Sequence, residues 1–194
     1  MYAVFFEMRP HPGHLDRYFE HVARLQPVLK RHSGLAFLER YGSLNGPDLI
    51  LSHQLWESEA AIADWRADPE HQRSQTAGRQ VHFADYRIRV GARVLHWHSD
   101  APAPMAPVAA ASEAPHILAL YGTQPMEGPD IAVFKSVSRN ERYIGLVTAH
   151  GRLGAEASLS SQLGAQGLEE AAIYSISRDY SRLDRAQAPN RTLA

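Results

Sequence analysis

The sequence contains no cysteine among its 194 residues. This absence excludes disulfide bonds, thiolate catalysis, cysteine-bound iron–sulfur clusters and zinc ribbons. The chain also lacks a basic run, and its formal net charge is −1, so nothing indicates a nucleic-acid partner. No apolar run approaches the roughly 20 residues that span a bilayer. The N-terminal MYAVFFEMRP has neither a basic leader nor a small-residue cleavage site, and we expect a cytoplasmic protein without a membrane partner.

The length suits two domains of roughly 100 residues each, and an apolar fraction of 44% is enough for packed cores. Residues 99–115, SDAPAPMAPVAAASEAP, are almost wholly Ala, Pro and Ser, which is typical of a linker. We therefore predict a first domain at 1–98, a linker at 99–115, a second domain at 116–184 and a flexible tail at 185–194.

Apolar residues that alternate predict strands, and apolar residues at three- and four-residue spacing predict helices. The first half then has strands at 2–9, 35–42, 48–56 and 81–97, with helices at 14–29, from Ser58 and from Asp68-Pro69. Asn45-Gly46 predicts a hairpin, because both residues tolerate positive φ. The order strand, helix, strand, strand, helix, strand predicts an α+β fold with a ferredoxin-like antiparallel sheet and helices on one face.

The second half repeats this order without the first helix. Its predicted elements are strands at 116–124, 130–138, 143–151 and 171–180 and a weaker helix at 154–167. We interpret the chain as two tandem copies, the second degenerate. The third strand of the first half is apolar on both faces, so a second sheet must cover it. That sheet comes from the same chain, as an intrachain pseudo-dimer, or from a second copy in a homodimer.

Reactive side chains are concentrated between Trp56 and Tyr86. Trp65 lies on an apolar helix face, where it is either a core anchor or part of a pocket. His71 begins a helix, and its ordinary pKa of about 6.5 suits proton transfer; the alternative is a surface or capping imidazole. We expect the helix N-terminus to lower its pKa. His53 lies among leucines in mid-strand and is either a satisfied core or interface histidine or a pocket contact.

Eleven histidines invite a metal hypothesis, but their spacing does not support one. His96 and His98 are the only close pair in a strand, and only Asp100 follows as a further ligand type. Zinc and related metals usually need three or four protein ligands. We therefore predict no metal site.

Residues 49–90 resemble the antibiotic biosynthesis monooxygenase domain family of the dimeric α/β-barrel superfamily, and the likeness extends over about residues 2–97. It rests on Trp56-Glu57-Ser58, Trp65, the corner Asp68-Pro69-Glu70-His71 and the strand Phe83-Ala84-Asp85-Tyr86. The resemblance implies paired sheets that form a barrel. Some members oxidise aromatic polyketides to quinones without metal or flavin, and others bind and degrade haem.

The resemblance also assigns positions. Trp56 matches the pocket tryptophan of the quinone-forming members, but Ser52 and Ile62 stand where their asparagine and tyrosine would be. Trp65 matches the tryptophan of the haem-degrading members. For that group, Gln75 occupies the position of the axial histidine, and Phe6 that of the first-strand asparagine.

Three hypotheses follow. The first is a cofactor-independent monooxygenase that acts on a planar aromatic or quinol-like small molecule, with His71 and Trp65 as catalytic residues and Trp56, Phe6 and His53 as substrate-binding residues. The second is a haem-binding or haem-degrading protein. The third is a non-catalytic ligand-binding or assembly domain, which is favoured if side chains fill the space between the first sheet and its helices.

Overall fold

The computed structural model describes residues 1–101 and 113–189, and its strands close into one barrel. The first half forms a ferredoxin-like antiparallel sheet in the order β4-β1-β3-β2, as the sequence predicts. Its elements are β1 (Tyr2–Pro10), α1 (Leu15–Leu29), β2 (Leu35–Ser43), β3 (Ile50–Trp56), α2 (Glu59–Ala67), α3 (Pro69–Ala77), a π-helical turn (Gly78–His82) and β4 (Phe83–His98).

The helices of this half begin and end at residues whose side chains or backbone favour those positions. The Ala61 N–H donates to Ser58 Oγ at 3.1 Å, and Asp68 Oδ1 accepts from the N–H groups of Glu70 and His71. Gly34, after α1, has φ +86°, which favours glycine. No helix in the described part of the chain has the length and apolar character needed to cross a membrane.

The β2–β3 hairpin forms by a different turn from the one that Asn45-Gly46 predicts. Positive φ occurs at Asp48, at 60°, and not at those two residues. Ser43 Oγ instead accepts from the N–H groups of Asn45 and Gly46, at 3.2 and 3.0 Å. A serine side chain therefore organises the loop, and β3 begins at Ile50.

The second half has the strand order β8-β5-β7-β6, which corresponds element by element to the order of the first sheet. Helix α4 starts at Gly151 (φ +78°) and ends before Gly164 and Gly167, which both have positive φ. The predicted helix 154–167 therefore begins and ends later in the chain than the observed helix. The loop after β5 covers part of the outer face of this sheet, and its Met126 and Ile131 pack over Gly145. The elements are β5 (Pro115–Gly122), β6 (Ala132–Ser136), β7 (Tyr143–His150), α4 (Gly151–Gln162) and β8 (Leu168–Ser181).

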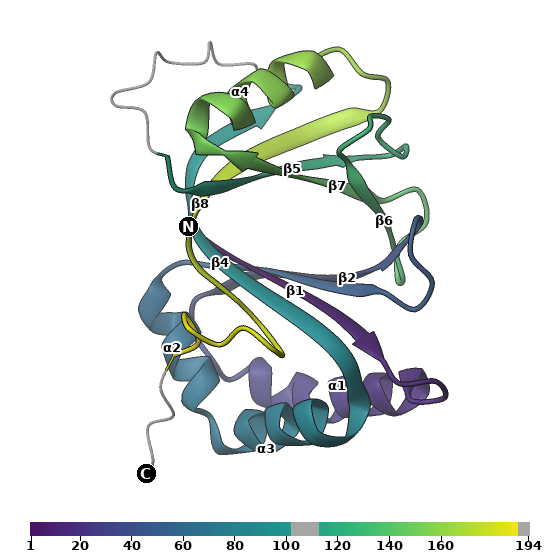
Figure 1. Ribbon diagram of the computed structural model, residues 1–194, viewed down its shortest axis with the longest axis vertical. Helices are drawn as coiled ribbons and strands as arrows, with labels where there is room; N and C mark the ends of the chain where they lie inside the picture. Colours follow the sequence, from purple (N-terminus) through teal and green to yellow (C-terminus); the bar gives the residue numbers. More distant parts are fainter. Residues whose placement is uncertain (102–112, 190–194) are drawn as a thin grey trace.

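Two seams join the sheets within one chain. At one seam β2 pairs with β6, and at the other β4 pairs with β8 from Arg87↔Ser181 to His98↔Glu170. The two sheets face each other, with α1, α2 and α3 on the outer face of the first and α4 on the outer face of the second (Figure 1). The chain thus supplies both sheets of its own barrel. The predicted linker 99–115 and the end of the predicted tail lie mostly outside the described residues.

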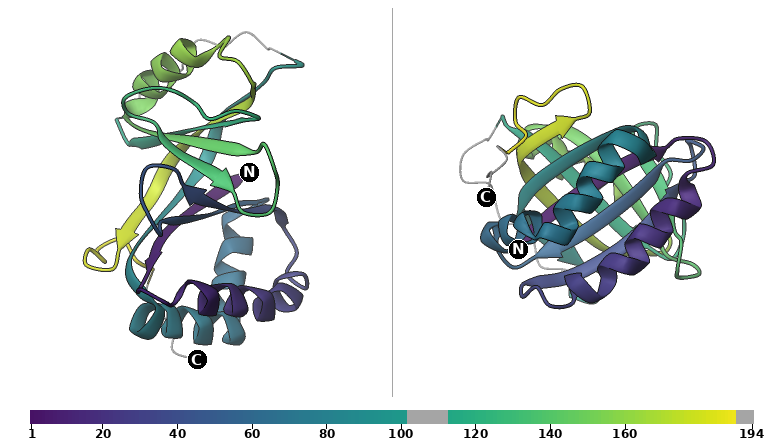
Figure 2. Two further views of the ribbon diagram at one scale, coloured as in Figure 1. Left: turned by 90° about the vertical axis from the view of Figure 1, so that its right-hand side faces the viewer. Right: turned by 90° about the horizontal axis from the view of Figure 1, so that it is seen from below.

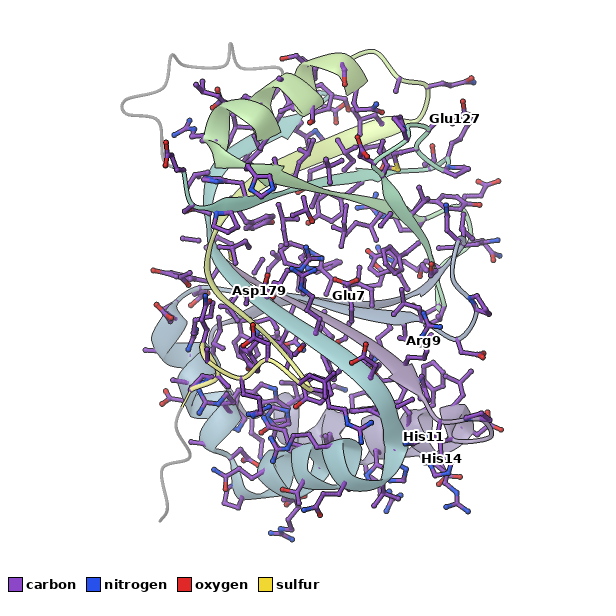
Figure 3. The ribbon with its side chains drawn as sticks, viewed as in Figure 1. Glu7, Arg9, His11, His14, Glu127 and Asp179 are labelled. Atoms are coloured by element: carbon purple, nitrogen blue, oxygen red, sulfur yellow. The ribbon has the colours of Figure 1, made fainter. Side chains whose placement is uncertain are left out.

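The apolar core is divided into layers by the sheets. The lumen between the sheets is filled with side chains, and Glu7 lies among them (Figure 3). Outside the first sheet, α1 and α3 lie side by side across it (Figure 2). That second layer holds the apolar clusters around Trp56 and Trp65 and around Met8 and Tyr18. We call it the helix layer.

Candidate functional site

Strand alternation divides the predicted site residues between the two layers. Phe6 and Trp56 face the helix layer, which also contains Trp65 and His71. His53 faces the lumen, where it contacts Phe5 and Tyr121. The reason is the two-residue period of a strand, since three positions separate His53 from Trp56 on β3. The structure therefore brings Phe6, Trp56, Trp65 and His71 together in the helix layer. The placement of His53 on the opposite face from Trp56 follows from their spacing, which the sequence alone shows.

Trp56 is a fully buried wall of the helix layer. Its exposed fraction is 0%, and its Nε1–H donates to Gln54 Oε1 at 3.0 Å. It packs against Val4, Ile62 and Val90. Because the indole N–H already has an acceptor, Trp56 can offer a ligand an aromatic surface more readily than a hydrogen bond.

Trp65 and His71 form a stacked pair. Their ring centroids are 3.9 Å apart, with 12° between the ring planes. His32 approaches Trp65 edge-on at 5.1 Å, and its Nε2 lies 3.1 Å from Asp68 Oδ2. The same aspartate caps α3, so the corner that the sequence singles out holds both histidines against one indole.

The His71 ring is neutral at pH 7. Burial lowers its pKa to about 4, although the hydrogen bond to Trp65 O and the charge of Asp68 act in the opposite direction. The predicted lowering is therefore correct, but burial is its main cause rather than the helix N-terminus. Nδ1 lies 2.8 Å from Trp65 O. A carbonyl can only accept, so Nδ1 carries the proton and Nε2 is the basic nitrogen.

Phe6 joins the two apolar clusters of the helix layer, and so does Ile88 on β4. Phe6 lies edge-on to Phe83 at 5.7 Å and to Tyr86 at 6.3 Å. Both Phe6 and Ile88 are only partly buried, whereas Trp56 has no exposed surface. The helix layer is thus filled at its tryptophans and keeps accessible apolar surface along the middle of the sheet.

Arg40 is a residue of this layer that the sequence reasoning missed. It follows Leu38 on the helix-facing side of β2, and its Nε–H donates to Tyr18 Oη at 3.2 Å. In the segment LAFLERYG, Arg40 has the same alternation parity as Leu38. A cation on the apolar face of a strand was the signal that could have revealed it.

His53 has the contacts of a satisfied core histidine. Burial lowers its pKa to about 3, and its Nδ1 lies 3.4 Å from Val4 O. Tyr121 Oη lies 2.7 Å from Nε2, and Phe5 stacks on the ring at 4.7 Å. Each polar atom of the ring therefore has a partner inside the lumen, away from the helix layer.

A separate hollow of about 480 Å³ lies on the second half, beside β7 and α4. None of the predicted site residues lines it. Its lining combines apolar and small side chains with a few polar ones, namely Asp130, Ala132, Leu146, Val147, Thr148, Ala149, His150, Gly154 and Ser158.

The ferredoxin-like sheet and its aromatic helix layer place the first half in the dimeric α/β-barrel class. The family model of antibiotic biosynthesis monooxygenases matches residues 1–77, so this part of the chain is similar to that family. A jasmonate monooxygenase from Pyricularia oryzae is 38% identical over 91 residues. That match covers 47% of this chain and 42% of the relative, so the chain spans less than half of that protein.

Solved structures also resemble the chain. An anthrone oxidase-like protein covers 97% of this chain and 96% of its own, with 10% identity and a TM-score of 0.42. A Pseudomonas aeruginosa protein covers 48% of this chain and 94% of its own, with 13% identity and a TM-score of 0.43. A Mycobacterium tuberculosis protein covers 47% and 92%, with 15% identity and a TM-score of 0.43.

Proposed function

We propose that the protein is a monooxygenase that oxidises a small planar aromatic or quinol-like molecule in the helix layer. The observation that carries this proposal is the accessible apolar surface of Phe6 and Ile88 between the sheet and its helices. The stacked Trp65 and His71 border the same layer. The family match over residues 1–77 supports a monooxygenase-like activity for this half.

The proposed reaction uses no metal or flavin. His71 Nε2 accepts a proton from an acidic C–H of the substrate, and the resulting carbanion transfers electrons to dioxygen. One oxygen atom then forms a carbonyl at that carbon and the other leaves as water, so that CH₂ and O₂ become C=O and H₂O. Because the pKa of His71 is about 4, it is a weak base. The proton must therefore be acidified by delocalisation into the substrate ring.

Trp65 and Trp56 have supporting roles in this proposal. Trp65 fixes the orientation of His71 through the ring stack and through its own carbonyl oxygen. Trp56 forms a rigid apolar wall. His53 lies on the other face of the sheet. In this proposal its role is limited to the packing of the sheet that carries Phe6.

The helix layer does not fit haem well. Gln75 stands at the position where the resemblance implies an axial histidine, and its amide nitrogen lies 3.3–3.4 Å from both His71 ring nitrogens. His71 itself is covered on one face by Trp65 and bound through Nδ1 to a carbonyl. We therefore derive no step through haem. A titration with haemin that produces no Soret shift would support this assignment.

We also propose that residues 1–98 and 116–184 are two domains, the second a degenerate copy of the first. The matching strand orders of the two sheets support this proposal. The short loop after β5, in place of a helix like α1, is the degenerate feature. Light scattering tests whether a chain that closes its own barrel also forms a homodimer.

An oxygen electrode tests the function. We expect oxygen consumption and a quinone product with hydroxylated anthrones, and we include jasmonate because the Pyricularia oryzae relative is named for it. Phe6→Leu should raise KM, and His71→Gln should lower kcat. Phe37→Leu is the matched control, because Phe37 contacts His53 on the lumen side of the sheet. Binding without oxygen consumption would favour the non-catalytic alternative.

A further inference from the structure

We propose that the molecule bound in the helix layer carries a carboxylate, and that Arg40 binds this group. The inference rests on the site proposed above and adds the chemical class of its ligand. It follows from the position of Arg40, from its lack of a carboxylate partner and from the shape of the guanidinium group.

Arg40 lies in one cross-strand row with Phe6. Arg40 on β2 is opposite Ser52 on β3, Ser52 is opposite Phe6 on β1, and Phe6 is opposite Ile88 on β4. All four face the helix layer. Neighbouring strands are separated by roughly 5 Å, so the guanidinium stem and the Phe6 ring arise about 10 Å apart. A ligand with its ring on Phe6 and an acidic group about one ring length away would reach both.

The charge of Arg40 has no counterion in the described part of the chain. Its side chain bonds Tyr18 Oη through Nε, and no carboxylate oxygen lies within 4.0 Å of it among the described ion pairs. Arg40 is only partly exposed and Tyr18 is buried. Carboxylate partners are present for three arginines of the sheets, Arg87, Arg89 and Arg178, and for Arg139 and Arg142 in the turn between β6 and β7.

A partly buried cation is costly unless an anion accompanies it. The Nε–H of Arg40 is used by Tyr18, which fixes the plane of the guanidinium. The two Nη groups remain to form the fork that binds a carboxylate in a bidentate manner. The Ser52 hydroxyl, between Arg40 and Phe6 in the row, can supply a further donor to the same group.

Calorimetric titration of the full chain tests the proposal with two probes that share one ring system, the anion 2-naphthoate and its uncharged methyl ester. We expect the unmodified protein to prefer the acid by roughly ten- to hundredfold, the range for a charge-assisted hydrogen bond. Arg40→Met should remove the preference, and Arg40→Lys should keep part of it. Arg24→Met is the control, because this substitution removes the same charge from the exposed side of α1.

The outcomes separate the ligand class from the site. If the unmodified protein binds the ester as tightly as the acid, or if Arg40→Met keeps the preference, the carboxylate proposal is overturned and the helix-layer site stands. If neither probe binds the unmodified protein, the site falls, and the carboxylate proposal with it. Circular dichroism establishes that Arg40→Met is folded. Should it not fold, the comparison of acid with ester on the unmodified protein and on Arg40→Lys still decides.

Discussion

The Tyr121 hydroxyl donates to His53 Nε2 at 2.7 Å in the centre of the barrel. The direction of this bond is determined by His53, which is neutral because burial lowers its pKa to about 3. Its Nδ1–H faces Val4 O, so Nε2 can only accept. The bond joins β3 of the first sheet to β5 of the second and is one of the polar contacts across the lumen.

Replacement of Tyr121 by phenylalanine should destabilise the whole chain. His53 Nε2 would then be buried without a donor, which costs about 1–3 kcal/mol. Urea unfolding followed by circular dichroism measures the change. Tyr143→Phe is the control, because Tyr143 is only partly buried and packs in the outer layer of the second sheet. Equal effects of the two substitutions would show that the central bond has no special role.

Acid should destabilise the protein below pH 6.5. The pKa values of His53 and His71 in the folded chain are about 3 and about 4, against an ordinary 6.5. Between pH 6.5 and 4 the unfolded chain therefore binds more protons, and the free energy of unfolding falls as pH falls, by up to about 1.4 kcal/mol per pH unit for each group. Unfolding midpoints measured from pH 7 to 4 test the slope.

His71→Phe isolates one of the two histidines in that experiment. Phenylalanine can keep the stack on Trp65 but cannot take up a proton. The slope between pH 6.5 and 4 should decrease by at most about one proton. His150→Gln is the matched control for the removal of one histidine, because the His150 side chain is exposed. Superimposable curves for His71→Phe and the unmodified protein would contradict the assignment of His71 as a buried neutral ring.

Gly91 marks a tight approach between the two halves. A Cβ at this position would lie 2.5 Å from Ser175 O, at a point where the pairing of β4 with β8 shifts register. Gly91→Ala should destabilise the chain by about 1–3 kcal/mol through overpacking. Gly42→Ala serves as the control, because nothing lies within 4 Å of its Cβ position. Thermal melts that show no difference between the two variants would disprove the contact.

Arg139 and Arg87 should contribute differently to stability, although both pair with a carboxylate. Arg139 binds Glu39, which is only 4% exposed, and its removal would leave a buried carboxylate without a cation, bound only by the Tyr41 and Ser136 hydroxyls. Arg139→Met should cost about 1–3 kcal/mol. Arg87→Met should cost about 0–1 kcal/mol, because its pair with Asp179 is half exposed. Denaturant unfolding of both variants measures the difference.

Much of the fold could be predicted because its signals are local. The caps at Ser58 and Asp68, the stop at Gly34 and the alternation of the strands each depend on a few neighbouring residues. The exceptions are also local in origin. The hairpin turn depends on the Ser43 side chain, and the end of α4 depends on positive φ at Gly164. Neither is visible from hydrophobic spacing.

The sequence by itself determined the element order, the resemblance of the first half to a known family and the stretch from Trp56 to His71 that borders the helix layer. Only the tertiary structure decided which strands pair across the seams, because pairing depends on residues far apart in the chain. It also decided that Arg40 meets Tyr18 and, among the described residues, no carboxylate, while Arg139 meets Glu39. Whether a charged side chain stabilises the fold or is available to a ligand depends on which residues the fold places beside it. Hydrophobic periodicity in the sequence does not identify those residues.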